Sequence, residues 1–202
     1  MNDAAAGTSQ GGPILVVGSS TGGTEAIKVF LSGMPRHAPP ILITQHMPES
    51  FTRSFVARLD GLCAMRVKEG AHQEKITSGT VYVAPGHSHM LLERAPGAGC
   101  RIVLNQNPPV NRHRPSVEVL FKAAAKVLGK SAIGIMLTGM GKDGAAAMLE
   151  MHRAGAYNFA QDENSCVVFG MPREAIALGA VDEVLSLDKL AGRVLSYLRV
   201  DK

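Results

Sequence analysis

The stretch Ile14-Leu15-Val16-Val17-Gly18-Ser19-Ser20-Thr21-Gly22-Gly23 indicates the fold of the whole chain. Its first four residues, 14–17, form a continuous apolar run, which is typical of a strand buried on both faces of a parallel sheet. Helical spacing follows over residues 24–34, and residues 40–44 are a second apolar run. Strand, helix and strand in this close succession predict a right-handed βαβ unit.

Strand and helix patterns continue to alternate along the rest of the chain. We expect further helices at 50–62, 115–129, after the loop 139–144 as far as 153, at 172–179 and at 188–198, and further strands at 132–138, 157–160, 167–168 and 181–185. The runs 80–83 and 90–92 resemble a hairpin around the turn Pro85-Gly86, with 101–104 paired beside it. The alternation predicts an α/β fold: a doubly wound, mostly parallel sheet with helices on both faces and an inserted β-hairpin.

The composition is that of an ordinary globular domain. The chain has 202 residues, of which 46% are hydrophobic and 19% are charged, so a full core can form without disulfide bonds or bound metal ions. We expect residues 1–12 to be a flexible segment and residues 13–202 to be one folded domain.

Charge and cysteine content exclude several functional classes. The formal net charge of +4 comes without a dense Lys/Arg block and with only 4% aromatics, so we expect no nucleic-acid partner. No apolar run approaches the roughly 20 residues of a membrane span, so we expect no insertion into a membrane. Cys63, Cys100 and Cys166 form no C-x-x-C pair, which favours buried thiols in a reducing, cytoplasmic compartment.

Residues 18–22 match G-x-S-x-G, the sharp strand-to-helix turn that presents a nucleophilic serine, here Ser20. The start of the next helix offers free N–H groups and a positive dipole end to a developing oxyanion. A P-loop would need Lys-Ser/Thr where Thr24-Glu25 stands, and a dinucleotide fingerprint would need an acid where the second strand ends in Gln45-His46. A plain glycine-rich packing turn remains the alternative.

Two further strand ends carry the groups that a nucleophilic serine requires. His46 follows the second strand, and Asp143 lies in the glycine-rich loop after the strand 132–138. Parallel strands end at one edge of a sheet, so we expect the three side chains to meet, with His46 Nε2 near hydrogen-bonding distance of Ser20 Oγ. An imidazole can remove the serine proton, and a carboxylate can fix the imidazole tautomer. The chain order Ser, His, Asp is not that of the α/β-hydrolases, which predicts a different fold.

Each of these residues also has a simpler interpretation. His46 is equally well read as a packed or solvated histidine, and Asp143 as a cap of the helix that follows it. His87 and His89 are candidate metal ligands, but no Cys/Asp set converges with them, so we expect no metal and no cofactor.

Several long blocks resemble the catalytic domain of CheB-type chemotaxis receptor methylesterases. The likeness covers about Ile14 to Leu198 and is carried by GSSTGGTEAI (18–27), ITQHMP (43–48), PPVNRHRPSVEVLF (108–121), LTGMGKDGA (137–145) and CVVFGMPREAI (166–176). The resemblance implies hydrolysis of γ-methyl esters on receptor glutamates with release of methanol, and often deamidation of receptor glutamines. The implied partners are methyl-accepting chemotaxis receptors with glutamate-rich helices.

The resemblance also implies a Ser-His-Asp triad of Ser20, His46 and Asp143, with Thr21 and Met140 as further members of the site.

Backbone N–H groups near Met140 are expected to help form the oxyanion hole, because Gly139 and Gly141 let the backbone approach closely. The basic loop that contains Arg112, His113 and Arg114 is either a contact for acidic receptor helices, through Arg112 and Arg114, or an ordinary solvated turn.

The chain departs from the family pattern in three places. Family members usually carry a receiver domain before the catalytic one, and this sequence contains none, because only about 13 residues precede the first strand; the chain is expected to be either an isolated catalytic domain or a free-standing relative. Ser19 and Lys142 stand where alanine and asparagine are expected, and Lys142 is expected to point to solvent. Two other functions stay open: a serine hydrolase of another carboxyl ester or amide, and a non-catalytic nucleotide-binding α/β module.

Overall fold

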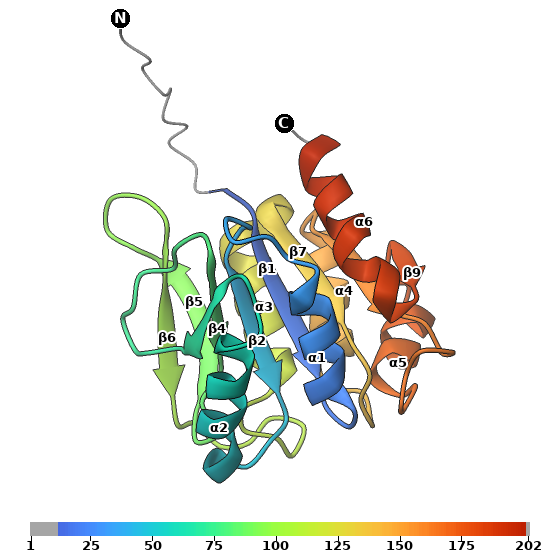
Figure 1. The fold of residues 1–202 in the computed structure, drawn as a ribbon, viewed down its shortest axis with the longest axis horizontal. Coiled ribbons are helices and arrows are strands. Elements are labelled where there is room, and N and C mark those ends of the chain that lie inside the picture. The colour runs from blue at the N-terminus through green and yellow to red at the C-terminus, as the bar shows by residue number, and fades with distance from the viewer. Residues whose placement is uncertain (1–11, 201–202) are drawn as a thin grey trace, which may run out of the picture.

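The structure, a computed structural model, describes residues 12–200. Figure 1 shows strands in the middle of the molecule with helices packed around them. The expected flexible segment, residues 1–12, falls outside the described residues except for Gly12.

Strands make up the centre of the described part of the chain. They are β1 (Ile14–Ser19), β2 (Ile41–Gln45), β3 (Arg66–Glu69), β4 (Thr80–Val83), β5 (His89–Arg94), β6 (Cys100–Asn105), β7 (Ala132–Met136), β8 (Tyr157–Gln161) and β9 (Glu183–Leu185). Seven of them form one sheet in the order β3-β4-β2-β1-β7-β8-β9. Every neighbouring pair in this sheet is parallel, whereas β5 and β6 form a separate antiparallel pair.

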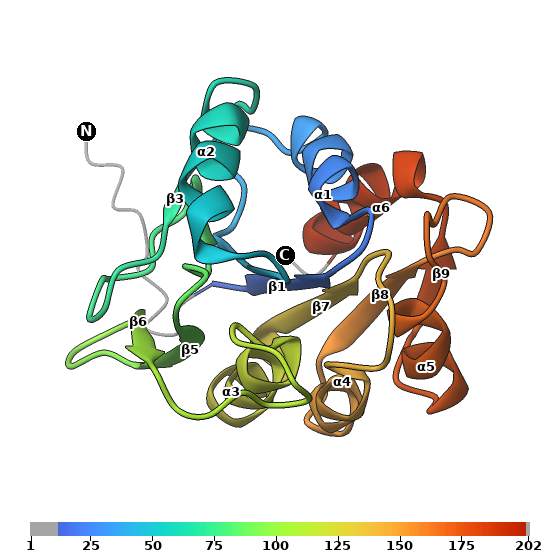
Figure 2. The ribbon, with the colours of Figure 1, turned by 90° about the horizontal axis from the view of Figure 1, so that it is seen from below.

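Helices cover both faces of the sheet. They are α1 (Gly23–Ser32), α2 (Glu49–Asp60), α3 (Val117–Leu128), the 3-10 turn η1 (Gly129–Ser131), α4 (Ala145–Arg153), α5 (Met171–Ala177) and α6 (Leu187–Val200). Figure 2 shows α1, α2 and α6 on one face, and α3, α4 and α5 on the other. The predicted doubly wound α/β fold is therefore confirmed.

The two faces have separate apolar cores, and β1 contributes to both. Leu15 and Val17 pack with Ile27 of α1 in one core, while Val16 packs with Phe121 of α3 in the other. A strand that is buried on both sides must be apolar at consecutive positions, which explains the continuous run at its start.

The predicted pairing of residues 80–83 with residues 90–92 is wrong. β4 instead lies inside the parallel sheet between β2 and β3. β5 pairs with β6, so the predicted pairing of residues 90–92 with residues 101–104 is confirmed. β3 was not expected, because Arg66-Val67-Lys68-Glu69 is mostly charged. Charged residues are common on an edge strand, which is where β3 lies.

The predicted strand at residues 167–168 is also absent. Val167 is 71% exposed, and Val168 bonds to the loop after β7 through its own N–H and carbonyl. The segment therefore crosses the carboxyl edge of the sheet instead of joining it.

The strand order reverses beside β1, with β2 on one side and β7 on the other. Ligands of doubly wound folds bind at such a switch point, outside the carboxyl ends of the strands. The loops after β1, β2 and β7 all emerge there. Within residues 12–200, none of the helices combines the length and apolar character that a membrane span needs.

Candidate active site

The ends of β1 and β2 hold Ser20 and His46 side by side. Ser19 lies opposite Gln45 in the parallel register, and the backbone N–H of His46 donates to the carbonyl of Ser19 at 3.1 Å. Ser20 and His46 are the residues that directly follow these two strands, so their Cα atoms lie about one strand spacing apart.

A buried glutamine side chain fixes these two strand ends relative to each other. Gln45 Nε2 donates to the carbonyl oxygens of Ser20 at 3.0 Å and His46 at 2.9 Å. Its Oε1 accepts from Ser19 Oγ at 2.7 Å, so Ser19 sets the orientation of the amide. A Cβ at Gly23 would lie 2.0 Å from this Oε1, which explains why a glycine begins α1.

His46 Nε2 faces Asp143, not Ser20. The distance from His46 Nε2 to Asp143 Oδ2 is 2.8 Å, and the two side chains are 8% and 2% exposed. An ionised carboxylate only accepts, so Nε2 carries the hydrogen and the lone pair is on Nδ1. Nδ1 is buried and has no partner among the described residues. The expectation that Nε2 would face Ser20 is therefore wrong, and Nδ1 is the nitrogen left for that role.

Asp143 lies at the N-terminus of α3. Its carboxylate accepts from Asn111 Nδ2 and Ser116 Oγ, both at 2.8 Å, and from the backbone N–H of Val117 at 2.7 Å. The alternative that Asp143 caps the helix following it is wrong, because Gly144 is the cap of α4 and Asp143 binds the first turn of α3 instead. Free N–H groups at a helix start stabilise a negative charge.

These donors keep Asp143 ionised. Burial alone would raise the pKa of the carboxyl group, but the hydrogen bonds from His46, Asn111, Ser116 and Val117 outweigh it, and the pKa lies below its ordinary value of 3.8.

A Ser116→Ala substitution tests these hydrogen bonds to Asp143. A group whose pKa is lowered on folding contributes stability that is present above its unfolded pKa and lost as the pH falls through its folded pKa. Removing one donor raises the folded pKa of Asp143 toward 3.8. We expect the free energy of unfolding at pH 7 to fall by about 1.5–3 kcal/mol and to depend less on pH below about pH 4. Urea unfolding between pH 7 and pH 2 measures both, and a loss of equal size at every pH would contradict the assignment.

His113 stacks on His46 and was not singled out by its position in the sequence. The ring centroids are 3.6 Å apart and the planes differ by 9°. Burial and the neighbouring His46 lower the pKa of His113, although Asp143 acts in the opposite direction. A neutral ring therefore covers His46 at pH 7 and restricts its rotation.

Exchanging the His113 ring separates packing from charge. We expect His113→Phe to retain most of the wild-type kcat, because a flat ring still covers His46. His113→Ala is expected to lose about 10- to 100-fold in kcat, because His46 is then free to leave its position. Steady-state kinetics of the ester hydrolysis that the sequence predicts measure both, and equal losses in the two variants would contradict a stacking role.

Ser20 is held beside the glycine-rich loop after β7. Its N–H donates to the carbonyl of Thr138 at 3.0 Å, and a Cβ at Gly139 would lie 2.9 Å from Ser20 Cβ. Only a glycine fits at this approach. The N–H of Gly139 donates to Val168 at 3.0 Å and is therefore not free for an oxyanion. In the described residues, the N–H groups of Met140 and Gly141 make no hydrogen bond.

The remaining predicted residues divide into exposed and internally bonded groups. Thr21, Arg112 and Lys142 are exposed, and Met140 is 70% exposed. Arg114 Nη1 donates to the carbonyls of Gln106 at 3.0 Å and Asn107 at 3.3 Å, so it braces its own loop.

His87 and His89, considered above as metal ligands, are hydrogen-bonded within the protein. Within residues 12–200, no three His, Cys, Asp or Glu side chains gather to hold an ion. His87 Nδ1 contacts Ser88 Oγ at 2.6 Å, and His89 bonds to backbone groups at both nitrogens.

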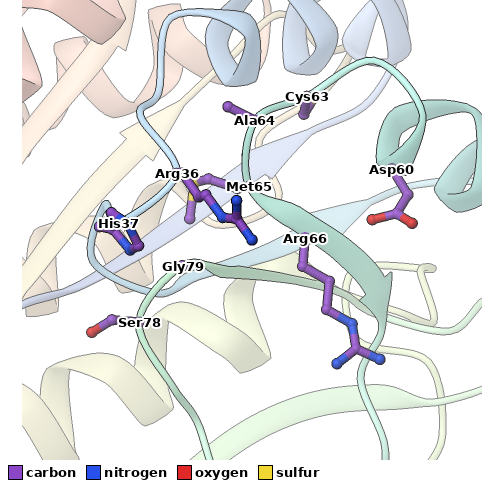
Figure 3. Close-up of a pocket in the computed structure, with 9 residues that line it drawn as sticks. All are labelled: Arg36, His37, Asp60, Cys63, Ala64, Met65, Arg66, Ser78 and Gly79. Carbon is purple, nitrogen blue, oxygen red and sulfur yellow. The ribbon is translucent and has the colours of Figure 1, made fainter.

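A hollow lies at the opposite edge of the sheet, before β2, β3 and β4 (Figure 3). It has a volume of about 420 Å³, and Arg36, Arg66 and Cys63 are among its lining residues. Burial raises the pKa of the Cys63 thiol, so this cysteine is not an activated nucleophile. The switch point is therefore the better candidate for a reactive site.

Comparison with known proteins places most of the chain in one family. Residues 15–194 match the family model for the CheB methylesterase. The chain is 62% identical over 185 residues to a protein-glutamate methylesterase/protein-glutamine glutaminase of Nitrosomonas europaea, covering 92% of this chain and 51% of that protein. A relative of the same name in Dechloromonas aromatica is 60% identical over 189 residues, covering 94% and 54%. The chain thus spans about half the length of these curated relatives.

A solved structure agrees in fold over nearly the whole domain. The crystal structure of the Thermotoga maritima CheB methylesterase catalytic domain has a TM-score of 0.89 and 36% identity, covering 92% of this chain and 98% of that one. With a family model matched over residues 15–194 and these relatives, the chain belongs to the CheB methylesterase family.

Proposed function

We propose that the chain hydrolyses γ-methyl esters of glutamate side chains in chemotaxis receptors, with Ser20 as nucleophile. The observation that carries the proposal is the pairing of His46 Nε2 with Asp143, which leaves an unpaired Nδ1 beside the strand end that bears Ser20. The names of the curated relatives, protein-glutamate methylesterase/protein-glutamine glutaminase, support the substrate class.

In the proposed reaction, Nδ1 of His46 takes the Ser20 hydroxyl proton as Oγ bonds to the ester carbonyl carbon. Asp143 stabilises the imidazolium through Nε2–H. The carbonyl oxygen becomes an oxyanion, for which the free N–H groups of Met140 and Gly141 are the candidate donors. Nδ1–H then protonates the departing methoxide, which leaves as methanol, and an acyl ester remains on Ser20.

A water molecule completes the cycle. His46 Nδ1 removes a proton from the water, whose oxygen attacks the acyl carbon, and the same proton returns to Ser20 Oγ. The product is a glutamate carboxyl group, which ionises. A glutamine side chain would follow the same path with ammonia as the leaving group, so we propose deamidation as a second activity of the same site.

Two exposed cations support an acidic protein substrate, and three free thiols support a cytoplasmic location. Arg112 and Lys142 are exposed on the loops around the site and pair with no acid among the described residues, so they are available to glutamate-rich helices. The free thiols Cys63, Cys100 and Cys166 agree with a reducing compartment.

The test is to incubate the chain with receptor membranes that carry labelled glutamate methyl esters, and with a small labelled methyl ester. We expect labelled methanol from the receptor in amounts that match the esters lost. Methanol from the small ester alone would indicate a hydrolase of another substrate. No methanol from either would contradict hydrolase function.

A further inference from the structure

His89 is a buried histidine outside the proposed triad. It is the first residue of β5 and is 1% exposed. Its Nε2 lies 3.2 Å from the carbonyl oxygen of Pro108, and its Nδ1 lies 3.2 Å from the backbone N–H of Ser116. A carbonyl only accepts and an amide N–H only donates, so Nε2 carries a hydrogen and Nδ1 accepts through its lone pair. Both nitrogens of the imidazole are therefore hydrogen-bonded to backbone groups.

These two bonds join the two ends of one loop, residues 108–116. The loop leaves the β5–β6 hairpin and ends at the N-cap of α3. Inside the loop, the backbones of Val110 and His113 exchange hydrogen bonds at 3.0 and 2.9 Å. One side chain from β5 thus bonds to both ends of the loop.

The same loop surrounds the proposed base and its carboxylate. Asn111 and Ser116 donate to Asp143, and His113 stacks on His46. Three of the contacts that position the Asp143–His46 pair therefore come from the 108–116 loop. His89 contributes none of them directly and does not reach the site itself.

We propose that His89 is a positioning residue: by bonding both ends of the 108–116 loop, it sets the geometry of the Asp143–His46 pair. This inference rests on the proposed hydrolase function of that pair. It also assigns a role to the β5–β6 hairpin, which lies outside the main sheet and presents His89 to the loop.

The test compares His89→Phe with His89→Gln. Phenylalanine keeps a ring in the core but makes neither bond, whereas glutamine offers one donor and one acceptor. We expect His89→Phe to lose about 10- to 100-fold in kcat on methylated receptor, because a misplacement of about 1 Å has effects of this size. KM should stay within about twofold, because the buried ring does not touch substrate. His89→Gln should recover part of the lost kcat.

Ile102→Ala is the matched control for loss of stability. Ile102 is fully buried in β6 of the same hairpin, where it lies opposite Leu92 and not opposite His89. We expect this variant to melt at a lower temperature than wild type with kcat unchanged at an assay temperature where it is folded. A kcat loss in Ile102→Ala equal to that in His89→Phe, at equal folded fraction, would overturn the proposal.

Hydrogen exchange gives a readout that does not depend on activity. The N–H of Ser116 donates to His89 Nδ1, so its exchange should accelerate in His89→Phe while the β5–β6 amides keep their protection. Unchanged protection of Ser116 together with wild-type kcat would overturn the positioning role. If wild type itself hydrolysed no ester, the proposed function would fail, and the exchange of Ser116 would still show whether His89 holds the loop.

Discussion

Replacing Ser20 with alanine is expected to lower kcat for hydrolysis of receptor methyl esters by about 10⁴- to 10⁶-fold, which is the loss that follows removal of a serine nucleophile. The fold should be unaffected, because no hydrogen bond of the Ser20 hydroxyl contributes to the described structure. Labelled methanol release from receptor membranes measures kcat, and thermal unfolding checks the fold.

Ser19→Ala is the matched control, because it removes a hydroxyl from the adjacent residue. Ser19 Oγ donates to Gln45 Oε1 and is fully buried, so its loss should lower stability by about 1–3 kcal/mol. We expect less than about a tenfold loss in kcat, because Gln45 keeps its bonds to the two carbonyls. A larger loss in Ser19→Ala than in Ser20→Ala would mean that the wrong serine has been assigned.

Asp143→Asn is the second substitution with a large expected effect, a loss of about 10³- to 10⁴-fold in kcat. An asparagine has the same shape but no charge, so it cannot stabilise an imidazolium at His46. Its amide also allows the other imidazole tautomer, in which Nδ1 carries the hydrogen and cannot act as a base. KM is expected to change little, because the 2% exposed carboxylate does not reach substrate.

The KM of Asp143→Asn distinguishes a catalytic role of the charge from a structural one, because the catalytic role predicts a loss in kcat with KM nearly unchanged. Ser116 Oγ donates to Oδ1 of Asp143 and the Val117 N–H donates to Oδ2, so asparagine, with one acceptor oxygen, keeps one of these two bonds, and thermal unfolding checks that the start of α3 stays folded. A variant that retains more than about a tenth of the wild-type kcat would show that the Asp143 charge is not needed.

The sequence predicted that Ser20, His46 and Asp143 lie at the same edge of the sheet, because the signal for each strand end is local. Ser20 and His46 come directly after β1 and β2, Asp143 lies in the loop after β7, and parallel strands end at one edge of the sheet. The imidazole orientation could not be predicted, because it depends on where the first turn of α3 places Asp143. That contact joins residues 26 positions apart and has no sequence period.

The sheet was predicted least well where its strands are polar or where neighbours in sequence are not neighbours in space. β4 and β5 are separated by only a short turn, which favoured a hairpin, yet β4 pairs in parallel with β2 and β3. The roles of His113 and His89 were hidden for the same reason. A stacked ring and a histidine bonded to two backbone groups are set by the path of the 108–116 loop, not by any pattern of residue types.

The most direct test of the account is to find which atom the substrate acylates. A receptor peptide in which a fluorophosphonate replaces the glutamate methyl ester should react once with the folded chain, and peptide mass mapping should place the adduct on Ser20. Unfolded chain should not react, because His46 and Asp143 are then no longer beside that serine. An adduct on any other residue, or none on the folded chain, would contradict Ser20 as the nucleophile.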